Sequence, residues 1–265
     1  MLQKTHDDFG DKVAAGLPAA IGVGRLVKRF GQKTVLDGVD IVVAQGSSLA
    51  LIGANGSGKS TLLRCMIRLI EPDSGTINLL GTEIAGAGRS ALKAARARVG
   101  FVFQQHNLVS RLSALSNVVH GVQSRTGGPR SWFHALASAQ VRDEAMACLE
   151  KVGLAEQALQ RVDSLSGGQS QRVAIARVLM QRPQIVLADE PDASLDPRTG
   201  EEIMQLLFDL TRANGATMIV VSHRMQHAID FSDRIVGLEN GRIAMDIPAT
   251  QACEAQLTSF FGEPA

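Results

Sequence analysis

A run of eight residues constrains the fold of this chain more than any other feature. The run is Gly53-Ala54-Asn55-Gly56-Ser57-Gly58-Lys59-Ser60. An apolar segment, residues 49–52, precedes it, and a helix-forming segment begins at Thr61. Glycines let the backbone curl until its N–H groups point inward, and a helix N-terminus adds partial positive charge. The run therefore predicts a strand, a phosphate-binding loop and a helix, in that order.

The residues of this phosphate loop have separate expected roles. In loops of this kind the lysine reaches the β- and γ-phosphates of a nucleotide, and the hydroxyl that follows it binds Mg²⁺. We therefore expect Lys59 to contact phosphate, Ser60 to bind Mg²⁺, and Thr61 to line the same site. The loop does not name a family, because kinases, GTPases and motor ATPases all use it.

Four short apolar segments, each ending at a polar residue or a glycine, indicate a buried parallel sheet. They are residues 49–52, 99–103, 185–188 and 218–221, and they are followed by Gly53, Gln104, Asp189 and Ser222. In open α/β sheets the ligand lies outside the carboxyl ends of the strands. We therefore expect these four ends to converge on one site.

The remaining segments have a different character. Residues 1–20 are typical of a flexible extension, and from Ile21 short apolar runs alternate with turn residues, as in a small antiparallel sheet. Residues 107–163 have helical patterning, with an amphipathic stretch at 139–152 and a break at 126–129.

Composition and charge exclude several classes of protein. Lys and Arg total 27 against 26 for Asp and Glu, so the net charge of +1 offers no field for nucleic acid. The cysteines Cys65, Cys148 and Cys253 are few, odd in number and far apart, which fits neither a disulfide framework nor a metal site. No secretory signal and no stretch of about 18 apolar residues is present. We expect a protein of a reducing compartment that reaches a membrane only through a partner.

A second motif distinguishes between the phosphate-binding families. Leu165 begins the pentapeptide Leu165-Ser166-Gly167-Gly168-Gln169, which leads into an amphipathic segment. By itself this is a helix cap, since serine caps helices and glycines suit turns. The pentapeptide arises by chance in about one chain in a thousand. Together with the phosphate loop it resembles the signature motif of ABC-type ATPases.

The resemblance covers residues 21–246 and implies a catalytic set. Asp189 corresponds to the carboxylate that holds Mg²⁺, which it shares with Ser60 and Gln104. Glu190 corresponds to the general base, and a carboxylate beside a metal can accept a proton from water. Gln104 also contacts the nucleotide and lies at a hinge. His223 corresponds to the residue that binds the γ-phosphate and the attacking water.

Further residues follow from the same resemblance. Phe30 takes the position of the aromatic side chain that stacks on adenine, where many relatives have Tyr. Ser194, Leu195 and Asp196 resemble the D-loop, which communicates across a dimer.

The resemblance also implies a fold and its division. The expected fold is the α/β fold of P-loop NTPases (RecA-like), with a parallel-sheet core, an antiparallel β subdomain and an α-helical subdomain. The ATPase domain spans residues 21–250: core and β subdomain at about 21–105 and 181–250, and helical subdomain at about 106–180. Residues 251–265 are expected to form a C-terminal tail, and the segment after Asp246 is expected to be too short for the regulatory domain of some sugar importers.

Several partners are implied. Two copies of the chain pack head to tail, so that Ser166, Gly167, Gly168 and Gln169 of one copy bind the ATP held by the other. Two integral membrane permease subunits bind the pair, which is peripheral on the cytoplasmic face of the inner membrane. A periplasmic or extracellular solute-binding protein acts through the permease, and no nucleic acid is expected.

The identity of the transported solute is indicated only by resemblance to relatives, because this subunit is not expected to contact the solute. The segments 103–113, 117–118 and 130–132, with Gly121, resemble the phosphonate-type importer branch, which phosphite and hypophosphite systems share. Two positions depart from that branch: His106 stands where Phe is frequent, and Val221-Ser222 stands where Thr-Leu is frequent.

Three alternatives remain open. One is an importer ATPase for another solute, such as amino acids. Another is a non-transport ABC ATPase of DNA repair or translation, although no coiled-coil insertion or second ATPase domain is visible. The third is a GTPase, although no Asn-Lys-x-Asp segment is present to bind guanine.

Overall fold

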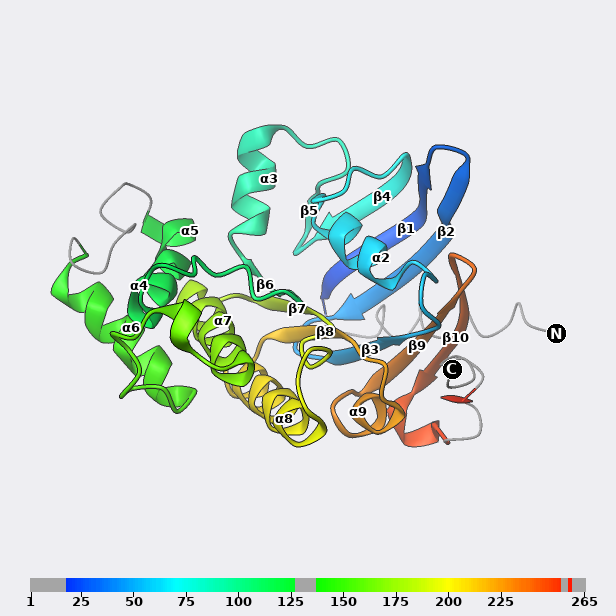
Figure 1. Cartoon of the computed structure of the whole chain (residues 1–265). Helices are drawn as coiled ribbons and strands as arrows, with labels where there is room; N and C mark the ends of the chain where they lie inside the picture. Colours follow the sequence, from blue (N-terminus) through cyan, green and yellow to red (C-terminus); the bar gives the residue numbers. More distant parts are fainter. Residues whose placement is uncertain (1–17, 127–136, 254–256, 259–265) are drawn as a thin grey trace. The chain divides into compact units, whose positions relative to one another are not determined.

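The structure is a computed structural model that describes residues 18–126, 137–253 and 257–258 (Figure 1). It divides into two compact units, the first from the segments up to Arg96 and from Gly215 onward, the second from Ala97–Asn214. Most of the predicted extension, most of the predicted break at 126–129, the segment 130–132 with Trp132, and most of the tail lie outside the described residues. The predicted helical subdomain, 106–180, falls inside the second unit, and its proposed boundaries remain a prediction.

An antiparallel sheet forms one layer of the first unit, as predicted. Its strands lie in the order β2 (Lys33–Ala44), β1 (Ala19–Phe30), β4 (Ser74–Leu79) and β5 (Thr82–Glu83). In β2 the side chains of Val39, Ile41 and Val43 are buried at every second position, the period of a strand with one face on the core. The sheet begins at Ala19, two residues earlier than predicted.

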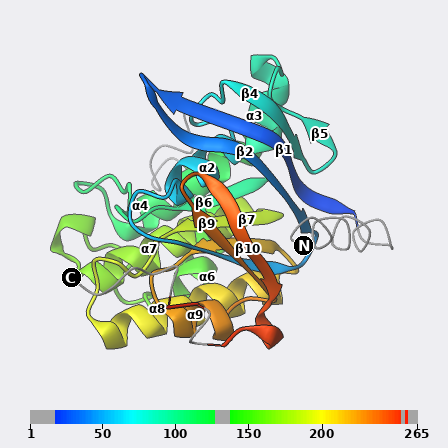
Figure 2. The same ribbon diagram turned by 90° about the vertical axis from the view of Figure 1, so that its right-hand side faces the viewer.

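The second sheet of this unit carries two of the four predicted strands. β3 (Ser48–Ile52) lies between β8 (Thr217–Val221) and β9 (Arg234–Glu239), parallel to both, and β10 (Arg242–Pro248) pairs antiparallel with β9 (Figure 2). Every residue of β3 and β8 is buried, which explains their unbroken apolar sequences. Because β3 and β8 are parallel neighbours, the residues that follow them emerge at the same sheet edge.

The helices of the first unit are α2 (Lys59–Met66), α3 (Arg89–Arg96), α9 (Met225–Asp230) and the short 3-10 turn η5 (Ala249–Gln251). Helix α2, which follows the phosphate loop, buries Leu62, Leu63, Cys65 and Met66.

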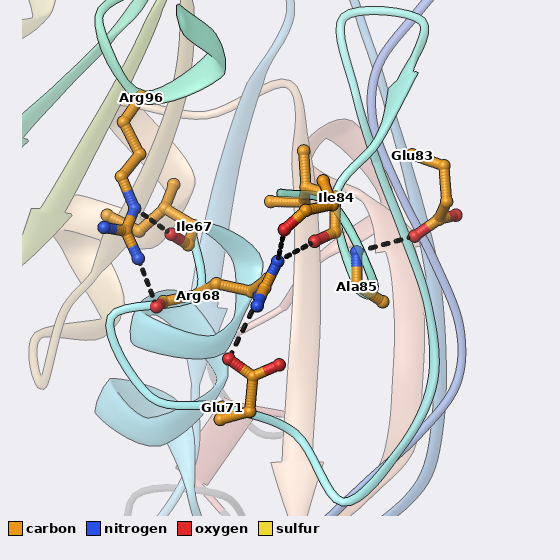
Figure 3. A network of polar contacts seen from close by, with 8 residues as sticks. Ile67, Arg68, Glu71, Glu83, Ile84, Ala85 and Arg96 are labelled. Atoms are coloured by element: carbon orange, nitrogen blue, oxygen red, sulfur yellow. Dashed lines mark hydrogen bonds and ion pairs between the residues drawn. The ribbon is translucent and has the colours of Figure 1, made fainter. Parts of the chain in front are cut away.

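Arginine side chains anchor the C-terminal end of α2 (Figure 3). Arg96 Nε of α3 donates to Ile67 O at 2.7 Å, and Arg68 donates to Ile84 O at 2.6 Å and to Ala87 O at 2.8 Å. Cations are favourable beside the exposed carbonyls at a helix C-terminus. Burial, and then the charge of Arg68, lower the pKa of Arg96. The helix that carries the phosphate loop is therefore fixed at its far end.

The second unit contains the other two predicted strands, β6 (Val99–Val102) and β7 (Ile185–Asp189), which pair in parallel. Its helices are α4 (Ala114–Val119), η1 (His120–Val122), α5 (Gln123–Thr126), α6 (Ala139–Lys151), η4 (Val162–Ser164), α7 (Gly167–Gln181) and α8 (Pro197–Ala213). Helix α6 confirms the predicted amphipathic stretch, and α7 packs against α4, α6 and α8. Across the described ranges, no helix is long and apolar enough to cross a membrane.

Candidate nucleotide-binding site

The phosphate loop, residues 53–60, joins β3 to α2 and has a backbone that requires glycine at two points. Gly53 has φ 148°, and a Cβ there would lie 2.3 Å from Leu238 O. Gly58 has φ 110°, and its Cβ would lie 2.8 Å from Val35 O. Gly58 is also the N-cap of α2 and makes no side-chain cap hydrogen bond. The loop is therefore a backbone cradle whose donors are suited to an anion.

Gly58→Ala is expected to destabilise the first unit. The substitution adds left-handed strain and a contact with Val35 O, and each costs on the order of 1–3 kcal/mol. Denaturant unfolding followed by circular dichroism measures the loss. Gly56→Ala is the matched control, because Gly56 has φ 80° and open space around its Cβ position. Equal losses from the two variants would contradict the role of the Val35 contact.

The polar groups of the loop fit a polyphosphate. Lys59 is 4% exposed, and its Nζ donates to Gly53 O at 2.7 Å and to Ala54 O at 3.0 Å, so the ammonium lies along the loop itself. Ser57 Oγ is buried and has no hydrogen-bond partner. Phosphate oxygens accept from both groups. Ser60 and Thr61 are half-buried in the first turn of α2, and their predicted roles at the site remain a prediction.

A hollow of about 360 Å³ lies beside this loop. Its walls are Lys33, Thr34 and Val35 of β2, residues 54–57 of the loop, and residues 238–241, which are the end of β9 and the turn to β10. The sequence analysis did not predict the first and third walls. A usable signal was the Asn240-Gly241 pair between two apolar runs, which is typical of a tight hairpin.

Phe30 and His223 also belong to the first unit. Phe30 ends β1 and is 51% exposed as a residue, and Lys28 Nζ lies 5.2 Å from the centroid of its ring. An exposed aromatic face of this kind is available for stacking. His223 is exposed and follows β8, while Gly53 follows the neighbouring β3. His223 and the phosphate loop therefore lie at the same edge of the sheet, as predicted.

Asp189 and Glu190 mark the end of β7 in the second unit. Asp189 is the last residue of the strand and is buried. Glu190 is half-buried and has φ 50°, a backbone conformation that residues other than glycine rarely adopt. Strained residues of this kind gather at active sites. The carboxylate of Asp189 is a ligand type that Mg²⁺ binds together with phosphate oxygens.

The segment after Glu190 contacts the signature motif through Leu195. Asp196 caps α8 by accepting from Thr199 N at 3.1 Å, and the hydrogen bonds from Thr199 lower the pKa of Asp196. Leu195 N donates to Asp192 O at 3.1 Å, and the Leu195 side chain lies 3.3 Å from the Cβ position of Gly167. The predicted D-loop, including the exposed Ser194, is therefore next to the signature motif of the same chain.

Ser166 caps α7 through reciprocal hydrogen bonds. Gln169 N donates to Ser166 Oγ at 3.2 Å, and Ser166 N donates to Gln169 Oε1 at 2.9 Å. This capping box fixes the loop that Gly167 and Gly168 continue. The predicted helix cap is present, and the exposed Ser166 keeps its O–H donor for another partner.

Gln104 is exposed two residues after β6, and the residues that follow it are held from two sides. Arg177 of α7 donates to Asn107 O at 2.6 Å and to His106 O at 3.2 Å. Asn117 of α4 accepts from Val109 N at 2.8 Å and donates to Val109 O at 3.1 Å. Burial lowers the pKa of Arg177 and of His106.

The predicted site residues thus divide between the two units. The first unit carries Phe30, residues 53–61 and His223, and the second carries Gln104, residues 166–169, Asp189, Glu190 and residues 194–196. Within the described residues, no cluster of three or more His, Cys, Asp or Glu side chains could hold a metal by itself. A metal at Asp189 therefore requires oxygens from other sources, such as a nucleotide.

Comparison with known proteins identifies the family. Residues 36–193 match the family described as ABC transporter. The chain belongs to this family. The predicted P-loop NTPase α/β fold and ATPase activity are confirmed by this match and by the solved cassette described below, and ATP is the nucleotide.

Two curated relatives and one solved structure illustrate the match. The phosphonates import ATP-binding protein PhnC of Stutzerimonas stutzeri is 44% identical over 92% of this chain and 90% of its own. The phosphate-import ATP-binding protein PhnC of Mycolicibacterium smegmatis is 48% identical over 84% of this chain and 85% of its own. A dimeric bacterial ABC transporter cassette has a TM-score of 0.77 and 33% identity, covering 86% of this chain and 98% of its own.

Proposed function

We propose that this cassette is the ATP-hydrolysing subunit of an importer for phosphonates or a related reduced-phosphorus oxyanion. The observation that carries the proposal is the 44% identity to a phosphonates import ATP-binding protein across 92% of the chain, which spans both units. The phosphate-import relative shares the same solute chemistry, an oxyanion of phosphorus. The resemblance of this chain's sequence segments to the phosphonate-type importer branch supports the same solute class.

In this proposal the first unit holds the nucleotide. The N–H groups of residues 53–61 and the ammonium of Lys59 bind the phosphates, and the ring of Phe30 stacks on adenine. His223 binds the γ-phosphate from the adjacent strand end. The glycine-dependent backbone, the inward lysine and the unpartnered Ser57 hydroxyl support these assignments.

The second unit supplies the general base and, in addition to Ser60 of the first unit, the ligands for the metal. Glu190 accepts a proton from the attacking water, and Asp189, Ser60 and Gln104 provide oxygen ligands for Mg²⁺, which would offset phosphate charge. The buried Asp189 and the strained backbone of Glu190 support these roles.

The working form in this proposal is a homodimer bound to two permease subunits at the cytoplasmic face of the inner membrane. Residues 166–169 of each copy donate hydrogen bonds to the ATP held by the other, and Ser194, Leu195 and Asp196 link the two sites. The exposed Ser166 hydroxyl at the start of α7 and the dimeric solved relative support this arrangement. An external solute-binding protein delivers the oxyanion to the permease.

Solute specificity is tested by stimulation of ATP turnover in the reconstituted complex. The binding protein loaded with a phosphonate is expected to raise phosphate release several-fold over the ligand-free binding protein, because the loaded form favours the closed, ATP-bound dimer. Phosphite, phosphate and an amino acid complete the panel. Stimulation by the amino acid alone would contradict the proposed solute class. Recovery of the chain only with DNA or ribosomes would contradict transport.

A further inference from the structure

The backbone of Glu190 needs support from its surroundings. Its φ of 50° is unfavourable for any residue with a Cβ, and the proline that follows, Pro191, favours an extended conformation at the residue before it. Such a conformation persists only where neighbouring contacts impose it. Ala193 N donates to Glu190 O at 3.3 Å, which closes the turn on one side.

Gln171 of α7 supports the other side of this turn. It is fully buried, and its Nε2 donates to Pro191 O at 2.8 Å. Because the proline ring fixes φ of Pro191, a bond to its carbonyl orients the whole residue, including the peptide link to Glu190. The other amide atom, Gln171 Oε1, is buried and has no hydrogen-bond partner.

The unpartnered oxygen argues against a purely packing role for Gln171. A buried acceptor without a partner costs on the order of 1–3 kcal/mol, and an apolar side chain of the same length would avoid that cost. What the amide provides, and an apolar side chain cannot, is the N–H group that holds Pro191 O.

We propose that Gln171 is a positioning residue that holds Glu190 in its left-handed conformation and so aligns the Glu190 carboxylate with the attacking water. The inference rests on the proposed function, since it assigns Glu190 as the general base. Gln171 lies five residues after Ser166 on the same helix, so α7 connects the signature motif to the turn that carries this base.

The test compares Gln171→Met with the wild-type chain in the reconstituted complex. Methionine keeps the length of the side chain but donates no hydrogen bond. We expect kcat to fall about tenfold to a hundredfold, as for a catalytic group displaced by about 1 Å. ATP affinity, measured by calorimetry under non-hydrolysing conditions, should stay within about twofold, because the proposed phosphate contacts of the first unit are untouched.

Gln181→Met is the matched control. Gln181 lies on the same helix and donates to Ala97 O at 3.0 Å and to Val99 O at 2.7 Å, away from Glu190. Its kcat should remain close to that of the wild type. An equal loss in Gln181→Met, or a loss of ATP affinity that matches the loss of kcat in Gln171→Met, would overturn the inference.

Gln171→Glu keeps the test decisive if methionine prevents folding. A protonated glutamic acid donates an O–H to Pro191 O, whereas the ionised form cannot. Burial raises the pKa of a carboxyl group, so activity relative to the wild type should rise as the pH falls from about 8 to about 6. A flat ratio would overturn the inference, as would a folded Gln171→Met with wild-type kcat. Absence of ATP turnover in the wild type would instead overturn the proposed function.

Discussion

Replacing Glu190 with Gln is expected to lower ATP turnover at least about a hundredfold while leaving ATP bound, since a positioned general base contributes about 10²–10⁴-fold. Glutamine has the same shape but cannot accept a proton from water. Because the γ-phosphate is then retained, the closed pair should accumulate. Phosphate release measures the turnover, and gel filtration in the presence of ATP measures the fraction of dimer.

The control for this prediction is Glu156→Gln, which removes the same charge from an exposed position of the second unit. It should behave like the wild type in both assays. A wild-type rate in Glu190→Gln would place the general base elsewhere and would also remove the basis for the role of Gln171.

Lys59→Ala is expected to weaken ATP binding about tenfold to a hundredfold, because hydrogen bonds to charged groups contribute about 1.5–3 kcal/mol. The affinity that Lys59 provides is reduced by any of its hydrogen bonds to Gly53 O and Ala54 O that the ammonium gives up on contacting a phosphate. Calorimetric titration with ATP measures the affinity.

Lys93→Ala, at an exposed position of α3, is the matched control and should leave the affinity unchanged. If Lys59→Ala bound ATP as tightly as this control, the cradle would owe its affinity to backbone N–H groups alone.

Local sequence patterns were sufficient to predict the four buried strands, the phosphate loop and the signature loop. The unbroken apolar runs of β3 and β8 indicated burial on both faces, and the glycines at 53 and 58 indicated a backbone that only glycine adopts. Ser166 was recognisable as a helix cap from its own residue type and from the two glycines that follow it. Each of these signals lies within a few residues of the feature that it predicts.

Contacts between distant segments could not be predicted in this way. The bond from Gln171 to Pro191 joins a helix to a turn twenty positions away, and that from Arg177 to Asn107 spans seventy. Val35 and Leu238 became walls of the candidate site only because β2 and the turn after β9 pack against the loop. Such pairs depend on how the elements pack, and no single residue type identifies them.

The hydrogen bonds of Arg177 and Asn117 have a mechanical consequence. They join residues 106–109 to α7 and α4, so this stretch follows any rotation of those helices as part of one body. Only Phe103, Gln104 and Gln105 then separate β6 from that body, so Gln104 lies in a linker of three residues. A small rotation of α7, whose N-cap is Ser166, would therefore move residues 106 and 107 and displace the nearby Gln104 with them.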